Sequence, residues 1–127
     1  MLPLLLAGCD AAWPSGSYVS VNARDAARLA PAVADYLASA LPSHATVALA
    51  PAQPGDPMTP VLTEALSHDG ITPAPTGRPV QYVVTPLDDG VLLHIALDGG
   101  STAASRYFVR SPDGSLTAAG PMMERTR

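Results

Sequence analysis

Three glycine-containing turn signals divide the C-terminal half of this 127-residue chain into short segments rich in strand-forming residues. They are Asp89-Gly90, Gly99-Gly100 and Asp113-Gly114, pairs that favour the tight turns of β-hairpins. Because strands joined by such short turns pair antiparallel, the sequence predicts a β-meander. The predicted strands cover residues 80–87, 91–98, 102–110 and 116–119.

The lengths of these turns predict which side chains share a face of the sheet. A two-residue turn at Asp89-Gly90 places Tyr82 opposite Leu97 in the first hairpin. A three-residue loop over residues 99–101 places Tyr107 on the same face as Leu97, together with Ala103, Ser105 and Val109. This largely apolar face is the predicted core face.

The opposite face combines aromatic, aliphatic and arginine side chains, which are enriched at protein–protein interfaces. We therefore expect a partner surface there, to which the single tryptophan, Trp13, could add a contact. A helix of the same domain covering this face is the alternative, because amphipathic helices need a surface to pack on. The residues of the expected surface are Leu87, Leu92, Arg106, Phe108, Arg110 and Trp13.

The N-terminal half predicts two amphipathic helices. Apolar residues recur at three- and four-residue steps over residues 26–41. Pro31 within this stretch predicts a kinked helix, and a helix that starts later with Pro31 in its first turn is the alternative. The second helix is expected to begin after a cap at Asp56 or Thr59 and to end at Gly70, with its buried stripe over residues 58–66. The predicted fold class is α+β, with two amphipathic helices packed on a small, mainly antiparallel sheet that ends in the β-meander.

Composition and motifs exclude several classes of function. Seven arginines, no lysine and eleven acidic residues give a formal net charge of −4, so no direct nucleic-acid binding through a basic face is expected. The sequence contains no metal-binding pattern such as Cys-x-x-Cys and no nucleophile motif such as Gly-x-Ser-x-Gly. We therefore predict a protein that is not an enzyme and holds no metal and no cofactor.

The only cysteine follows an apolar N-terminal segment. Residues 1–9 read Met-Leu-Pro-Leu-Leu-Leu-Ala-Gly-Cys, and Asp10 comes next. An apolar run, two small residues and a cysteine are typical of the end of a bacterial lipoprotein signal peptide, where the Cys9 thiol accepts a diacylglycerol group. An N-terminal strand that ends in a buried free cysteine is the alternative.

The lipoprotein interpretation predicts three segments. Residues 1–8 are the remnant of the signal peptide, residues 9–17 are a flexible tether, and residues 18–127 are a single α+β periplasmic domain. In this interpretation Trp13 lies in the tether, at the lipid headgroups or on a partner. Packing of Trp13 on the edge of its own domain is the alternative.

Most of the chain resembles the TrbH conjugal transfer lipoprotein family. The similarity is carried by the lipoprotein-like start, the helical segment 26–42, YVVTPLDDGVLL at residues 82–93, ASRYF at 104–108 and Gly120-Pro121. The resemblance implies a structural and assembly role, as a lipoprotein of a Trb-type IV secretion system, in conjugative DNA transfer. A periplasmic adaptor or regulator of another envelope complex is the alternative function.

The resemblance also implies partners and a location. The implied partners are the other subunits of the secretion channel core complex and the membrane, through a lipid on Cys9, and a homo-oligomeric ring is compatible with this role. The protein would face the periplasm. The resemblance favours the outer membrane, whereas Asp10 directly after the cysteine favours the inner membrane.

Overall fold

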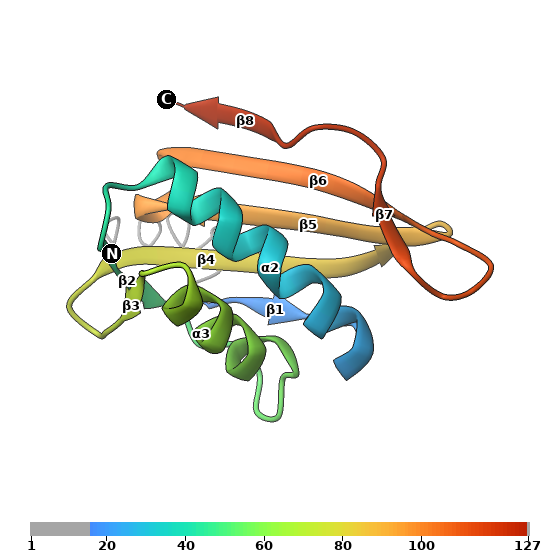
Figure 1. The fold of residues 1–127 in the computed structure, drawn as a ribbon, viewed down its shortest axis with the longest axis horizontal. Helices are drawn as coiled ribbons and strands as arrows, with labels where there is room; N and C mark the ends of the chain where they lie inside the picture. Colours follow the sequence, from blue (N-terminus) through green and yellow to red (C-terminus); the bar gives the residue numbers. More distant parts are fainter. Residues whose placement is uncertain (1–15, 127) are drawn as a thin grey trace, which may run out of the picture.

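The computed structural model describes residues 16–126, which form two α-helices and one mixed sheet (Figure 1). The helices are α2 (Ala23–Ala40) and α3 (Met58–His68). The strands are β1 (Tyr18–Val19), β2 (Thr46–Leu49), β3 (Thr72–Pro73), β4 (Arg78–Leu87), β5 (Gly90–Leu97), β6 (Thr102–Arg110), β7 (Leu116–Ala118) and β8 (Met123–Thr126). These elements confirm the predicted α+β class.

The sheet is antiparallel in the C-terminal half of the chain and parallel where strands from the N-terminal half join it. Its order is β3-β2-β4-β5-β6-β7, with β1 also paired with β4 and β8 also paired with β6. The predicted meander is β4 to β7. β2 pairs parallel with both β3 and β4, and β1 pairs parallel with β4. α3 carries the chain from the end of β2 back to the edge of the sheet where β2 begins, so β3 can pair parallel with β2.

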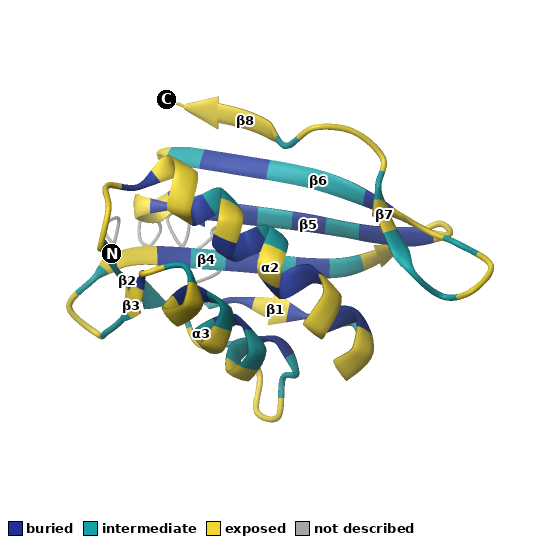
Figure 2. Cartoon of the chain, viewed as in Figure 1, coloured by how far each residue is buried: buried dark blue, intermediate teal, exposed yellow. Residues whose placement is uncertain are grey.

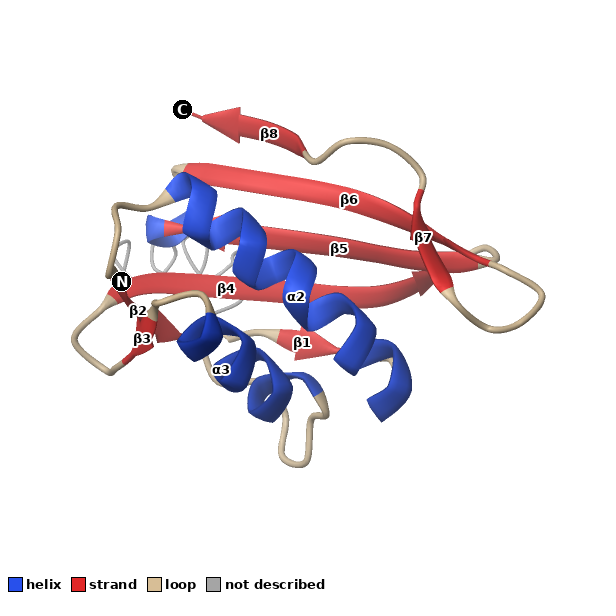
Figure 3. Ribbon diagram, in the orientation of Figure 1, coloured by secondary structure: helices blue, strands red, loops and turns tan. Residues whose placement is uncertain are grey.

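Both helices pack on the same face of the sheet (Figure 3). The hydrophobic core lies between them and this face, and the segments of the chain that form it are coloured dark blue, as buried, in Figure 2. Its largest fully buried side chains include Leu29, Val33 and Leu37 of α2, Leu62 and Leu66 of α3, and Tyr82, Val84, Leu93 and Ile95 of the sheet. The alternative in which one helix covers each face of the sheet is therefore wrong.

Local capping chemistry sets where the helices begin. The Asn22 Oδ1 atom accepts a hydrogen bond of 2.8 Å from the Asp25 backbone N–H, so α2 begins before the first residue of the apolar repeat. α2 then continues through Pro31 as one helix. Asp56 Oδ1 accepts 2.8 Å hydrogen bonds from the backbone N–H groups of Met58 and Thr59, so Asp56, and not Thr59, is the one of the two predicted residues that caps α3.

The first hairpin of the meander has a different turn from the predicted one. Leu87 pairs with Gly90, so the two-residue turn is Asp88-Asp89 and not Asp89-Gly90, and Tyr82 lies opposite Ile95. The shift is of two residues. Because side chains alternate between faces with a period of two, the prediction of which β4 and β5 side chains face the core is unaffected.

The second hairpin corrects the predicted partner surface. Leu97 pairs with Thr102, so four residues form the loop in place of the predicted three. Asp98, Gly99 and Gly100 all have positive φ angles in this loop. The resulting one-residue shift moves every β6 side chain to the other face. Phe108 therefore packs in the core with 7% of its surface exposed, whereas Tyr107, predicted for the core face, lies on the opposite side.

Candidate interaction surface

The second face of the sheet has no helix over it in the part of the chain from residue 16 to residue 126. We call it the helix-free face. The alternation of side chains along the paired strands assigns residues to it. Its larger side chains are Tyr18, Gln81, Val83, Thr85, Leu87, Leu92, His94, Ser105, Tyr107, Val109, Thr117, Met123 and Arg125.

The exposed large apolar side chains of the described residues all lie on the helix-free face. They are Tyr18, Leu87, Val109 and Met123, with 52%, 46%, 42% and 69% of their surface exposed. The register of the described strands places no aspartate or glutamate on this face. An apolar surface free of carboxylates, on a protein with a formal charge of −4, has the character of a protein interaction site.

Tyr107 fixes the local shape of this face. Its hydroxyl group donates a hydrogen bond of 2.7 Å to the Leu87 carbonyl oxygen. Its ring lies close against Gly90, where an added Cβ atom would be 2.8 Å from both the Tyr107 Cζ and Oη atoms. Tyr107 also pairs directly with Leu92 across the β5–β6 ladder. The tyrosine thus holds together the end of the face at which Leu87 and Val109 are exposed.

A neutral polar pair lies further along the same face. His94 Nδ1 and Ser105 Oγ are 2.8 Å apart on directly paired residues of β5 and β6. Burial, and to a smaller extent the positive charge of Arg125, lower the pKa of His94, so its imidazole is uncharged at neutral pH. Within residues 16–126 no carboxylate bonds to this imidazole, and the pair is a cross-strand contact with no acid to orient a catalytic base.

A shallow hollow of about 300 Å³ borders the pair. It lies between β5, β6 and the segment that leads into β8. Its lining includes Leu92, Ser105, Tyr107, Gly120, Pro121 and Met123. The hollow would allow a partner's apolar side chain to enter the face beside Leu92.

The structure separates the residues of the predicted surface. Leu87 and Leu92 lie on the helix-free face, as predicted. Phe108 and Arg106 lie on the helix side, because of the one-residue shift in β6. Arg106 Nε donates a 2.7 Å hydrogen bond to the Gly120 carbonyl, and its Cζ atom is 5.9 Å from the centre of the Phe108 ring. The predicted patch of leucines, phenylalanine and arginines on one face is therefore wrong.

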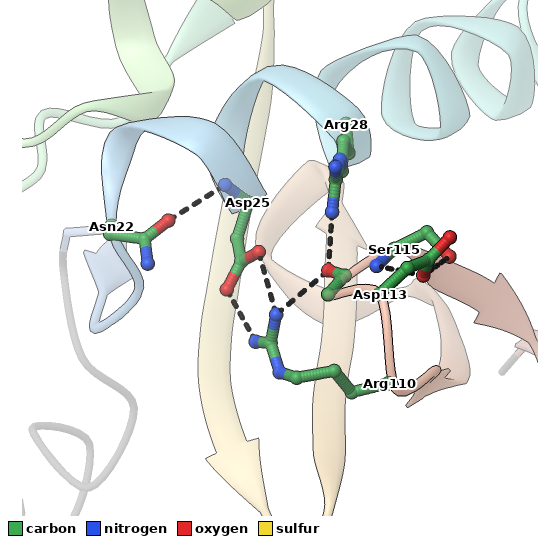
Figure 4. A network of polar contacts seen from close by, with 7 residues as sticks. Asn22, Asp25, Arg28, Arg110, Asp113 and Ser115 are labelled. Atoms are coloured by element: carbon green, nitrogen blue, oxygen red, sulfur yellow. Dashed lines mark hydrogen bonds and ion pairs between the residues drawn. The ribbon is translucent and has the colours of Figure 1, made fainter.

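Arg110 is also on the helix side, where it makes an ion pair that joins β6 to the first turn of α2. Its Nη1 and Nη2 atoms lie 3.1 and 2.5 Å from the two carboxylate oxygens of Asp25, whose side chain is only 4% exposed (Figure 4). Arg28 and Arg110 both donate to the Gly114 carbonyl in the next turn. The role of Arg110 is thus to hold the β6–β7 hairpin against α2.

Sequence reasoning missed Tyr18, Tyr107, Val109 and Met123 as surface residues. Along β6, odd-numbered and even-numbered positions both contain an aromatic residue and small or polar residues, so the pattern of residues does not choose a face. The length of the loop before β6 makes the choice. Three successive residues able to adopt positive φ, Asp98-Gly99-Gly100, were the available sign of a longer loop.

Cys9 and Trp13 lie outside the described residues, so the lipidation site and the contribution of Trp13 stay predictions. Across residues 16–126 no group of three or more histidine, cysteine, aspartate or glutamate side chains is placed to hold a metal ion. Neither helix in that range is sufficiently long and apolar to span a bilayer.

The family comparison covers the whole of the described fold. A family model described as conjugal transfer protein TrbH matches residues 10–126, a stretch that includes both helices and every strand described above. No curated protein and no solved structure matches the chain. The chain belongs to the conjugal transfer protein TrbH family.

Proposed function

We propose that this conjugal transfer protein is a lipid-anchored component of a type IV secretion apparatus, with a structural and assembly role. Membership of the TrbH family is consistent with a type IV secretion component and with contacts to other parts of the transfer apparatus. The mechanism we propose is physical: an anchor keeps the domain at the membrane, and the domain binds a neighbouring subunit. No chemical step is required of it.

One observation carries the binding half of this proposal. The exposed large apolar side chains of the described residues gather on the helix-free face, and no carboxylate of the described strands lies among them. Burying Leu87 and Val109 against a partner would contribute about 25 cal/mol for each Å² of apolar surface removed from water. We propose the helix-free face as the contact with another subunit of the secretion channel core complex.

The anchoring half rests on the segment around Cys9. A cysteine that carries two or more acyl chains holds a protein stably on a membrane, because each buried CH₂ group contributes about 0.8 kcal/mol. Gly16 and Ser17, predicted as the end of the tether, are hydrogen-bonded to the domain, and Ser17 is buried. Residues 10–15 can reach no further than roughly 21 Å when fully extended, at about 3.5 Å per residue. The domain would therefore stay close to the membrane and at a high effective concentration beside its partners. We propose that it faces the periplasm, with either membrane as the site of the anchor.

Cys9→Ser tests the anchor. A serine hydroxyl does not accept the diacylglycerol group, so we expect the variant to move from the membrane fraction to the soluble fraction and to lose labelling by a palmitate analogue. Trp13→Ala, which keeps the cysteine and alters the same segment, is the matched control and should stay with the membranes. Anchoring by lipid is wrong if the serine variant still sediments with membranes after a high-salt wash.

Leu87→Glu tests the helix-free face. It puts a charge where 46% of the side chain is exposed, so the fold should be retained while docking of an apolar partner is opposed. We expect plasmid transfer to fall at least about tenfold, the effect of roughly 1.4 kcal/mol at an interface. Ala23→Glu adds the same charge at an exposed position in the first turn of α2 and should leave transfer unchanged. Equal transfer frequencies in the two variants would contradict this role of the face.

A further inference from the structure

A groove runs between α2 and α3, on the side of the molecule that faces away from the helix-free face. Its volume is about 440 Å³. Small and apolar side chains form most of its lining: Ala27, Ala30, Pro31, Ala34, Val61 and Ala65. The four alanines leave room for a backbone to approach both helices closely.

The polar residues of the groove are mostly acidic. Asp35 of α2 faces Asp69 at the end of α3, and Glu64 and His68 lie on α3 one turn apart. Hydrogen bonding to the neighbouring Asp69 carboxyl group, followed by burial and by repulsion from Asp69, raises the pKa of Asp35. Two carboxyl groups held this close repel each other when both are ionised.

No arginine of the described chain neutralises these carboxylates. The ion pairs found within residues 16–126 are Arg78–Asp98 and Arg110–Asp25, both away from the groove. Arg28 and Arg106 donate to backbone carbonyls. The lining of the groove contains no arginine, and the sequence contains no lysine, so the carboxylates of the groove leave room for cationic side chains of another molecule.

Pro31 adds a backbone acceptor to the same lining. Proline has no N–H group, so the carbonyl of Ala27, one turn earlier in α2, lacks its usual helical donor. Both residues line the groove. The groove therefore combines an apolar floor with carboxylate and carbonyl acceptors, which complements a ligand that is apolar on one side and carries hydrogen-bond donors with positive charge.

We propose that the groove between α2 and α3 is a docking site for a cationic amphipathic helix of a partner protein. Small side chains of that helix would pack between the two helices, and its arginine or lysine side chains would reach Asp35, Asp69 and Glu64. The acidic rim disfavours the phosphates of nucleic acids and lipids. The groove and the helix-free face lie on opposite sides, so the domain could hold two partners at once.

The test uses the full chain carrying Cys9→Ser and a synthetic peptide of about four helical turns, with alanines on one side and arginines on the other. We expect saturable binding, with changes in the methyl resonances of Ala27, Ala34 and Ala65. Asp35→Asn with Asp69→Asn should weaken binding at least about tenfold, since it removes the carboxyl groups that would pair with the arginines of the peptide. Asp88→Asn with Asp89→Asn, in the β4–β5 turn, removes the same charge elsewhere and should have little effect.

Three outcomes would overturn the proposal. Equal weakening by the two double variants would show general charge attraction. Equal binding of a peptide with glutamates in place of the arginines would remove the charge argument. If the peptide does not bind, and calcium ions alone cause the same resonance changes, the groove is a cation site and not a docking site for a helix.

Ala27→Leu is a further variant, which leaves the charge of the protein unchanged. Its larger side chain should fill the exposed floor of the groove and weaken binding of the peptide. Since no lipid takes part, the result is independent of the proposed anchor.

Discussion

Gly90→Ala is expected to destabilise the domain by about 3 kcal/mol, at the upper end of the range for overpacking. An alanine Cβ at this position would lie 1.9 Å from the Phe108 carbonyl oxygen and 2.8 Å from the Tyr107 ring. The carbonyl belongs to the backbone of β6 and cannot move without disturbing the β5–β6 ladder. The tyrosine ring is also held, through its hydroxyl group, by the Leu87 carbonyl.

Urea unfolding measures this loss of stability, and Gly120→Ala is the matched control. Gly120 also lies outside the positive φ range, and no heavy atom beyond its chain neighbours lies within 4 Å of an added Cβ atom. We expect that variant to stay within about 0.5 kcal/mol of the parent. If the two glycine variants unfold at the same urea concentration, close approach of Tyr107 and β6 does not explain the glycine at position 90. Gly90→Ala should also change the helix-free face, since Tyr107 is part of it.

Asp25→Asn is the second substitution with a large expected effect, a loss of about 2–3 kcal/mol of folding stability. The Asp25 carboxylate is buried and accepts two hydrogen bonds from the Arg110 guanidinium, which joins α2 to the β6–β7 hairpin (Figure 4). An amide keeps the size of the side chain but removes the charge and one of the two acceptor oxygens. Asp25 is the buried partner and Arg110 is 39% exposed, so the loss arises at position 25: the amide gives up a charge-assisted bond and turns an NH₂ group towards the guanidinium.

The same chain provides the control for this substitution. Arg78 and Asp98 form another two-bond ion pair, with Nε and Nη2 distances of 3.3 and 2.6 Å. Their side chains are 46% and 34% exposed, so solvent screens the pair and its contribution to stability is small. We expect Asp98→Asn to leave the thermal unfolding midpoint almost unchanged while Asp25→Asn lowers it by many degrees. Equal shifts would mean that burial does not determine the value of these pairs.

Much of the local structure follows from short-range chemistry and was predictable. The strand over residues 102–110 has the predicted bounds. β4 begins two residues earlier than predicted and ends at the predicted Leu87, whereas β5 is one residue earlier at both ends. The cap of α3 at Asp56 was also predictable, because an aspartate before a helix can accept from its first free N–H groups. Each of these features depends on residues that are close together in the chain.

Only part of the candidate surface was predictable. Its residues depend on the register of the β4–β5 and β5–β6 hairpins, which the local sequence pattern does not determine. Leu87 and Leu92 remain on the expected face, since the error of two residues in the first hairpin preserves the alternation. Phe108 moves to the core and Tyr107 to the surface, since the error of one residue in the second hairpin reverses it. The acidic groove was not predicted, because Asp35 and Asp69 lie on different helices that meet only in the folded chain.

The sequence by itself determined the α+β class, the meander, the two helices and the resemblance to a conjugal transfer family, because periodicity, turn residues and caps act over a few neighbouring positions. Only the tertiary structure decided that both helices share one face, that β1, β2 and β3 join in parallel, and which side of β6 meets the core. Those outcomes depend on pairing and packing between distant segments. A single additional loop residue was enough to exchange a core side chain for a surface one.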